Sequence, residues 1–228
     1  MFLYDPTIIM LIPVLLIAIY AQYKVKSTFN KYSEINASVN KTAAEVVKKL
    51  LVQNGVNDIK VKRIEGNLND HYDPKNKELN LSQNIYGSNS IAAIGVAAHE
   101  AGHAIQDSKG YTPLKLRANL VPLASIGSNW GLPMAFIGFL LQTQFLIALG
   151  FIMFLGAFVF HLVTLPVEFN ASKRALTLLK KYNILNSKEI KGAKKVLRAA
   201  AFTYLSATLV ALVNLLRIVV LFGMGRND

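Results

Sequence analysis

Three long apolar stretches constrain what this chain of 228 residues can fold into. They cover residues 7–23, 118–165 and 199–224, and the first two contain no Asp, Glu, Lys or Arg. A helix needs about 20 residues to cross the hydrocarbon core of a bilayer, which is about 30 Å thick. The run 118–165 is too long for one crossing, and its polar residues 142–144 predict a turn between two helices. The sequence therefore predicts four transmembrane helices.

The charged residues indicate how these helices are oriented. Of the 25 Lys and Arg residues, 14 lie in the segment 24–117 and 9 in the segment 166–198. The two chain ends carry only Asp5, Arg226 and Asp228. Because Lys and Arg accumulate in loops on the cytoplasmic side of a membrane, we expect both basic segments to be cytoplasmic. Both chain ends then lie on the other side, which requires an even number of spans and agrees with four.

The spans divide the chain into five segments. In order, they are a first span at 1–23, a cytoplasmic part at 24–117, a transmembrane hairpin at 118–165, a cytoplasmic helix at 166–198, and a fourth span with a short tail at 199–228. We expect these segments to form one integrated domain in the cell membrane. Its predicted class is mainly α, a four-helix multi-pass transmembrane protein with a small cytoplasmic α+β element.

The α+β element is predicted within 24–117 from local patterns. Apolar residues recur at helical spacing over 38–53, and a two-residue alternation over 58–64 predicts a strand. Turn-forming residues at 70–77 predict a hairpin whose second arm is 78–82. A sheet this small needs a neighbour, and we expect the helix that follows it to cover it. An exposed edge strand of the sheet could bind an extended peptide as a further strand.

The sequence His-Glu-Ala-Gly-His carries the strongest chemical signal in the chain. Ser90 can cap a helix that contains this motif and Gly110 can end it. Four residues apart on one helix, His99 and His103 project from the same face and can bind one metal ion. Zn²⁺ suits two imidazoles and a further ligand, with a water in the open position. Glu100 could take a proton from that zinc-bound water as it attacks a peptide carbonyl, which predicts metal-assisted peptide hydrolysis.

Such a site still lacks one protein ligand, and Glu168 is the best candidate. It follows the third predicted span in a basic segment whose other acidic residue is Glu189. Pro166 suits the first turn of a helix, so we expect a new helix to begin there with Glu168 near its start. Glu189 follows a loop and is more simply explained as a charge near a helix cap. His161 could be a ligand or a proton relay, although an interfacial histidine bonded to a backbone carbonyl is the simpler interpretation.

Four further polar residues have open roles. If the predicted hairpin lies beside the metal, His71 could stabilise the oxyanion that develops during hydrolysis; a solvated turn residue is the simpler interpretation. Arg174 could bind a substrate carbonyl or an acid, or it could face lipid phosphates. Asp107 would cap the end of the metal-binding helix or contact a neighbouring loop. Arg217, in the fourth span, must find a partner or extend toward the membrane surface.

The composition excludes some classes of protein. A net charge of +12 would suit nucleic acid, but no recognition motif is present and the charge flanks the spans, so we expect anionic lipid headgroups as its partner. The chain has no cysteine, which excludes disulfides and thiolate ligands.

Two alternatives to an enzyme are a proteolytically inactive membrane scaffold that keeps the metal site and a metal transporter. A scaffold has no use for Glu100, and the spans contain almost none of the acidic residues that ion transport requires.

Three phrases of the sequence carry a family resemblance: residues 70–74, 96–106 and 168–172. With the order of the spans, they resemble the YugP-type neutral zinc metallopeptidases of bacterial membranes. The resemblance implies a membrane endopeptidase that binds one zinc ion and cleaves peptides or proteins, including membrane proteins, near the cytoplasmic face. The family is similar to HtpX-type and prenyl-protein-processing membrane peptidases, in which a later Glu completes the zinc site and an Asp follows four residues on. Glu168 matches that Glu, but Ser172 stands at the Asp position, so we hypothesise that Ser172 or Asn170 orients a histidine ring instead.

Overall fold

The structure, a computed structural model, describes residues 6–224. Asp5, Arg226 and Asp228, whose charges support the predicted orientation, lie outside the described residues, as does the predicted tail after Met224. The chain divides into two compact units. The first unit comprises Met1–Gln22, Lys115–Pro166 and Phe202–Asp228, and the second comprises Tyr23–Leu114 and Val167–Ala201. The five-segment division into one integrated domain stays a prediction.

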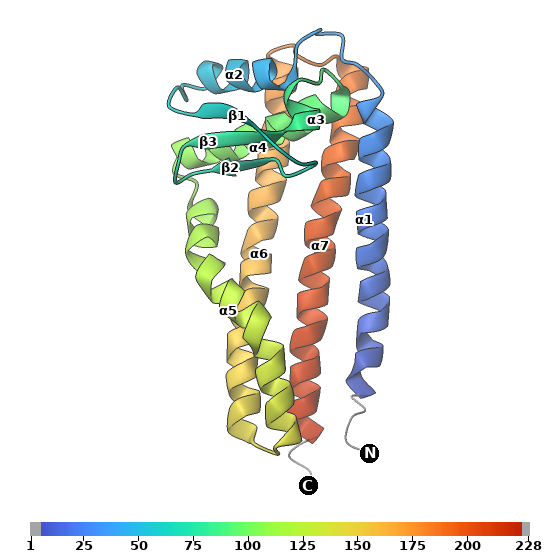
Figure 1. The fold of residues 1–228 in the computed structure, drawn as a ribbon, viewed down its shortest axis with the longest axis vertical. Coiled ribbons are helices and arrows are strands. Elements are labelled where there is room, and N and C mark those ends of the chain that lie inside the picture. The colour runs from blue at the N-terminus through green and yellow to red at the C-terminus, as the bar shows by residue number, and fades with distance from the viewer. Residues whose placement is uncertain (1–5, 225–228) are drawn as a thin grey trace. The chain divides into compact units, whose positions relative to one another are not determined.

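Four helices in the described part are long and apolar enough to cross a membrane (Figure 1). The elements that form them are η1 Pro6–Met10, a short 3₁₀ helix, followed by α1 Leu11–Ser33, α5 Thr112–Leu140, α6 Gln144–Lys181 and α7 Ser187–Met224. The predicted turn between the second and third spans is confirmed, because residues 141–143 separate α5 from α6 and Gln142 has a φ of +56°. The predicted class, mainly α with four candidate spans and a small sheet, is also confirmed.

The prediction that a new helix begins at Pro166 is wrong. Helix α6 continues through Pro166 to Lys181. A proline inside a helix removes one backbone hydrogen bond and crowds the preceding turn, so continuing the helix has a cost. The residues that follow offset it, because Val167, Ala171 and Ala175 are fully buried at helical spacing. Glu168 therefore lies in the interior of a long helix and not near the start of a new one.

The cytoplasmic helix predicted at 166–198 is also two pieces. It consists of the end of α6 and the beginning of α7, with residues 182–186 between them. Helix α1 likewise continues to Ser33, beyond the end of the first predicted span. Helix α7 likewise begins before the fourth predicted span, at Ser187. The parts of α1 and α7 outside the predicted spans have a buried face in the second unit, which includes Phe29 on α1 and Val196 on α7. Hydropathy marks the part of a helix that can cross a bilayer, whereas packing decides where the helix ends.

In the first unit, α5 and α6 pack with their backbones in close contact. A Cβ atom on Gly150 would lie 2.5 Å from the nitrogen of Ala135 and 2.6 Å from the oxygen of Gly131. Small residues allow helices in a membrane to approach this closely and to gain van der Waals contact. Six side chains form the buried cluster of this unit: Ala135, Ile147, Phe154, Ala211, Leu215 and Ile218.

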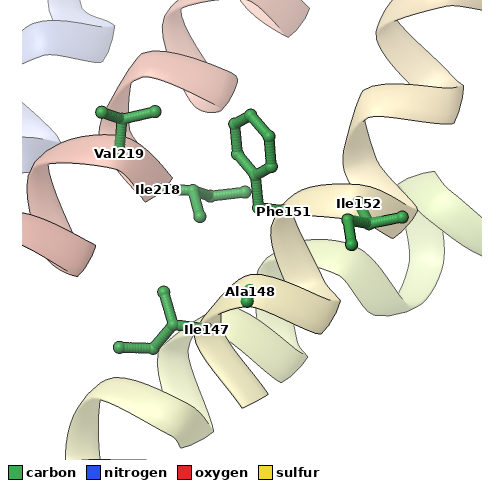
Figure 2. A pocket seen from close by; sticks show the side chains of 6 residues that line it. All are labelled: Ile147, Ala148, Phe151, Ile152, Ile218 and Val219. Carbon is green, nitrogen blue, oxygen red and sulfur yellow. The ribbon is translucent and has the colours of Figure 1, made fainter. Parts of the chain in front are cut away.

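The first unit also has an apolar groove of about 280 Å³ between α6 and α7 (Figure 2). The residues that line it are Ile147, Ala148, Phe151, Ile152, Ile218 and Val219. None of these side chains carries a hydrogen-bonding group, so the groove suits hydrocarbon and offers nothing to fix the orientation of a polar ligand.

Arg217 finds polar partners in the fourth predicted span. Its Nε donates a hydrogen bond to the hydroxyl of Thr7 (3.1 Å), and one terminal nitrogen donates to Oδ1 of Asn214 (2.9 Å). A charged side chain inside a span needs such partners, because hydrocarbon cannot solvate it. Of the two predicted possibilities for Arg217, a partner or an extension toward the surface, the structure has the first.

In the second unit, the amphipathic helix is α2 Ala43–Gln53, which begins later than the predicted start at residue 38. Thr42 caps it, because the amide of Glu45 donates to the Thr42 hydroxyl (3.3 Å) and the amide of Thr42 donates to the Glu45 carboxylate (2.8 Å). This reciprocal arrangement satisfies two backbone donors and defines where a helix starts. The apolar residues of the predicted pattern, such as Val47 and Leu50, are buried.

Three strands form a small sheet, with β1 Lys60–Ile64, β2 His71–Asp73 and β3 Glu78–Ser82. Their order is β1-β3-β2, so β3 is central and β2 is an edge strand. The predicted hairpin is confirmed, because β2 pairs antiparallel with β3 and places His71 opposite Asn80. In its turn the Asp73 carboxylate accepts hydrogen bonds from the amides of Lys75 and Asn76. The predicted strand at 58–64 is confirmed from Lys60 onward, and it pairs parallel with β3.

The helix that contains the histidine motif is α4 Ile91–Ser108, which follows the short helix α3 Gln83–Tyr86. Its predicted cap is confirmed, because the hydroxyl of Ser90 accepts a hydrogen bond from the amide of Ala93 (3.1 Å). The sheet lies across α4 (Figure 1), and Leu79 and Leu81 of β3 share a buried cluster with Ala97 of α4. The expectation that this helix covers the sheet is therefore confirmed.

Glu189, in the first turn of α7, connects two distant segments of the second unit. Its carboxylate accepts hydrogen bonds from the amide of Ser38 (2.7 Å), the hydroxyl of Ser38 (3.1 Å) and the amide of Asn186 (2.7 Å). The side chain of Asn186 in turn accepts from the amide of Glu189 (3.0 Å), which caps α7. This agrees with the simpler interpretation of Glu189 as a charge near a helix cap.

Replacing Glu189 with alanine is expected to destabilise the protein by about 1–3 kcal/mol, because it removes a buried carboxylate that accepts hydrogen bonds from the amides of Ser38 and Asn186. The midpoint of thermal unfolding in detergent measures this change. Glu65→Ala is the matched control, since Glu65 is exposed and its side chain makes no hydrogen bond or ion pair with any described residue. Equal midpoints for the two variants would contradict the connecting role of Glu189.

Candidate metal centre

Helices α4 and α6 come into close contact at the histidine motif. A Cβ atom on Gly102 would lie 2.7 Å from the carbonyl oxygen of Ala171 and 3.2 Å from its Cα. Real side chains do not approach a backbone that closely, so this position needs glycine. Gly102 precedes His103, and Ala171 lies about one helical turn beyond Glu168. The contact therefore brings the carboxylate of one helix to the imidazoles of the other.

The three predicted ligands come together. Nε2 of His99 lies 3.1 Å from Oε2 of Glu168 and 3.1 Å from Nε2 of His103, and Nε2 of His103 lies 3.5 Å from the same carboxylate oxygen. Tetrahedral zinc with bonds of about 2.0–2.1 Å places its ligand atoms about 3.3 Å apart. The observed spacing fits that value, and two imidazoles with one carboxylate form a donor set that zinc accepts. His99, His103 and Glu168 are therefore positioned to hold a metal ion.

Each imidazole uses its other nitrogen for a second contact. Nδ1 of His99 lies 3.1 Å from the hydroxyl of Ser172, and Nδ1 of His103 lies 3.0 Å from Oε1 of Gln106. Such contacts orient each ring so that its Nε2 faces the other ligand atoms. Of the two residues in our hypothesis, Ser172 contacts a histidine directly, whereas Asn170 contacts Gln106 instead (3.0 Å).

Glu100 is buried and lies outside the ligand cluster. Its Oε2 accepts a hydrogen bond from the backbone amide of Tyr72 in β2 (3.1 Å). Burial raises the pKa of the Glu100 carboxyl, and the imidazoles of His99 and His103 oppose this only in part. A carboxylate with a raised pKa is better suited to accept a proton and return it than an exposed one.

Side-chain contacts hold the hairpin of β2 and β3 on α4. The Tyr72 hydroxyl donates to Oδ2 of Asp107 (2.8 Å), and the ammonium group of Lys77 lies 2.6 Å from the same oxygen. Burial, together with the acceptor Asp107, raises the pKa of Tyr72, so its hydroxyl stays a donor. Asp107 thus contacts a neighbouring loop, one of its two predicted roles. These contacts place the amide of Tyr72 beside Glu100.

The other candidate residues lie outside the metal cluster found among the described residues. Nδ1 of His71 lies 2.8 Å from the carbonyl oxygen of Asn69, and its Nε2 lies 3.1 Å from the side-chain nitrogen of Asn80. Both ring nitrogens are therefore engaged by neighbours on the hairpin. His161 contacts Phe160 in the first unit, with ring centroids 5.8 Å apart.

Arg174 is attached to the network that surrounds the ligands. Its Nε donates a hydrogen bond to Oδ1 of Asn170 (2.7 Å), the same oxygen that accepts from Gln106. The side chain is half-buried, and Asn170 lies one helical turn before it on α6. This contact places the guanidinium group on the ligand-bearing helix without making it a ligand.

Two residues of the site do not appear in the sequence predictions. Gln106 lies three residues after His103, a spacing that places both on one helical face, so its position was a usable signal. The amide of Tyr72 carried no such signal, because any residue supplies a backbone N–H and only the docking of the hairpin directs this one at Glu100.

Replacing Gly102 with alanine is expected to separate α4 from α6 and to move Glu168 away from the histidines. Overpacking of this kind costs about 1–3 kcal/mol, so both the midpoint of unfolding and the affinity for zinc should fall. The measurements are thermal unfolding and competition with a chelator. Gly87→Ala is the control, because a Cβ atom there meets nothing within 4 Å. Wild-type zinc affinity in Gly102→Ala would show that the close contact is not required.

Comparisons with known proteins agree with this geometry. The model of a family described as "Putative neutral zinc metallopeptidase" matches residues 7–223. The chain is 44% identical over 213 residues to "Putative membrane protease YugP" of Bacillus subtilis (strain 168), which is 93% of this chain and 94% of that protein. No solved structure matches the chain significantly. The match covers nearly all of the chain, including α4 and α6 with the three clustered residues, and the chain belongs to this family of neutral zinc metallopeptidases.

Proposed function

We propose that the protein is a membrane-bound endopeptidase that uses one zinc ion to hydrolyse peptide bonds of polypeptides near the cytoplasmic face of the membrane. The convergence of His99, His103 and Glu168, with the separate carboxylate of Glu100 beside them, carries this proposal. Membership of a zinc metallopeptidase family and the similarity to a protein named a membrane protease support it.

The donor set suits a catalytic zinc ion. Structural zinc sites use four protein ligands, whereas catalytic sites use three and leave a position for water or substrate. His99, His103 and Glu168 are three, and they are the only such cluster among the described residues. When bound, zinc polarises a carbonyl group and lowers the pKa of a water molecule to about 7.

Glu100 has the role of general base in this proposal. Its carboxylate would accept a proton from the attacking water and then donate that proton to the nitrogen of the leaving amine. The hydrogen bond from the amide of Tyr72 holds Oε2, so the carboxylate has a fixed orientation. Ser172 and Gln106 orient the two imidazoles during these steps.

The edge strand β2 is suited to present a substrate to Glu100. The amide of Tyr72 bonds to Glu100, so the edge of β2 that is not paired with β3 lies next to this carboxylate. A peptide that lies along this edge in extended form would be beside Glu100, with the amide of Tyr72 still bonded to that carboxylate. Recognition through the backbone tolerates many side chains, as expected of an endopeptidase that acts on polypeptides.

The charge distribution supports a cytoplasmic site. The histidine motif lies in the basic segment 24–117, and Glu168 lies in the basic segment 166–198. Lys and Arg near spans favour the cytoplasmic side, where anionic lipid headgroups also attract them. Membrane proteins and segments close to the membrane are therefore suitable substrates. A proteolytically inactive membrane scaffold is the alternative, and the activity of a Glu100 variant distinguishes the two.

Replacing Glu100 with glutamine is expected to lower the rate of peptide cleavage by a factor of about 10²–10⁴ while zinc content stays at the wild-type value, because the base is lost and the ligands remain. Cleavage of casein and the zinc content of protein purified in detergent measure the two effects. Glu168→Ala is the matched comparison and should lose both zinc and cleavage. Full cleavage by Glu100→Gln, with contaminating proteases excluded, would overturn the role of Glu100, and absence of cleavage by the wild type would favour the scaffold.

The orientation can be tested with single cysteines, because the chain has no cysteine of its own. Thr143, between α5 and α6, and Lys75, in the hairpin turn, are both exposed. In right-side-out membrane vesicles, a membrane-impermeant maleimide should label Thr143→Cys at once and Lys75→Cys only after permeabilisation. The opposite pattern would place the histidine motif outside the cell.

A further inference from the structure

Gln106 contacts both a histidine of the motif and the ligand-bearing helix α6. It is fully buried, with 0% of its surface exposed. Its Oε1 lies 3.0 Å from Nδ1 of His103, and its Nε2 donates to the carbonyl oxygen of Val167 (2.9 Å) and to Oδ1 of Asn170 (3.0 Å). A buried amide is costly unless its polar atoms are satisfied, and here every contact is made at the metal centre.

The partners of this amide determine its orientation. The carbonyl oxygen of Val167 can only accept a hydrogen bond, so it must face the amide nitrogen of Gln106. The other end of the network gives the same answer, because Arg174 can only donate and therefore fixes Oδ1 of Asn170 as an acceptor. With its nitrogen directed at two acceptors, Gln106 presents its oxygen to His103.

The orientation of Gln106 in turn determines the tautomer of His103. An amide oxygen can only accept, so Nδ1 of His103 must carry a proton. In the neutral ring, Nε2 then has the free lone pair, and this is the nitrogen that faces His99 and Glu168. The histidine is therefore prepared to bind a metal through Nε2 before any ion arrives.

Ser172 does not impose a tautomer on His99 in the same way. A hydroxyl group can donate or accept, so it adapts to either form of the ring. The two histidines consequently differ, since one is held by an oriented amide and the other by an adaptable hydroxyl. Removal of the Gln106 amide should therefore weaken metal binding, although Gln106 is not itself a ligand.

We infer that Gln106 is a positioning residue that fixes His103 for metal binding and fastens α6 beside Glu168. The inference rests on the proposed function, because it concerns the zinc ion of that site. Gln106 bonds to the carbonyl of Val167, the residue directly before Glu168. One side chain thus holds a ligand on α4 and the neighbour of a ligand on α6, which keeps His103 and Glu168 close together.

The test is a pair of substitutions at residue 106 in the full chain, purified in detergent. Gln106→Met keeps the length of the side chain but removes both kinds of hydrogen bond. Gln106→Glu keeps an acceptor for His103 and replaces the donor to Val167 with an oxygen. Because loss of a residue that orients a metal ligand lowers metal affinity about 10–100-fold, we expect that loss for Gln106→Met. We expect a smaller loss for Gln106→Glu.

Two measurements separate positioning from a general loss of stability. The first is the dissociation constant of zinc, obtained by competition with a chelator, and the second is the absorption spectrum of the Co²⁺-loaded protein, which reports ligand geometry. Glu189→Ala is the control, since Glu189 stabilises the same unit through Ser38 and Asn186. It should lower the unfolding midpoint without changing zinc affinity or the Co²⁺ spectrum.

The outcomes distinguish this inference from the proposed function. A wild-type protein that binds no zinc would overturn the proposed function and this inference with it. A wild-type protein that binds zinc, with Gln106→Met equal to it in affinity and spectrum, would overturn only the inference. Loss of zinc affinity in Glu189→Ala to the same extent as in Gln106→Met would also overturn it, because affinity would then follow stability. If Gln106→Met does not fold, the zinc affinity of Gln106→Glu decides, because this variant loses the donor to Val167, and a wild-type affinity there contradicts the inference.

Discussion

The close contact of α4 and α6 at Gly102 is the constraint on which the metal centre depends. It joins two helices that are far apart in the sequence and brings a carboxylate that is 2% exposed into contact with two imidazoles. An isolated buried carboxylate would be strongly unfavourable, whereas a carboxylate beside imidazoles, and beside a metal ion when one is bound, is stabilised by them. A side chain larger than a hydrogen atom at this contact would separate Glu168 from the imidazoles that stabilise it.

The polar side chains around the ligands have their hydrogen-bonding groups satisfied. Among the described residues, no buried side-chain nitrogen or oxygen lacks a hydrogen-bond partner. Ser172 and Gln106 hold the imidazoles with neutral groups, where a carboxylate such as the Asp of similar families would add a second negative charge next to Glu168. A neutral shell leaves Glu168 as the only charged ligand and still orients both rings.

Sequence patterns predicted the local structure well and failed where packing competes with propensity. The capped helix α4, the hairpin of β2 and β3, and the turn between α5 and α6 follow from residues close together in the chain. Pro166 is the instructive failure, because its local preference for a helix start is outweighed by the burial of Val167, Ala171 and Ala175. The partner of Arg217 was equally beyond reach, since Thr7 lies at the other end of the chain.

The sequence by itself determined the four apolar helices, the paired histidines on one helical face and the candidate carboxylates, because hydropathy, helical periodicity and residue chemistry are local properties. Only the tertiary structure decided that Glu168 meets the histidines, that the amide of Tyr72 holds Glu100, and that Gln106 reaches both His103 and Val167. These contacts depend on how closely helices and strands pack, and packing results from many residues acting together and not from any one motif.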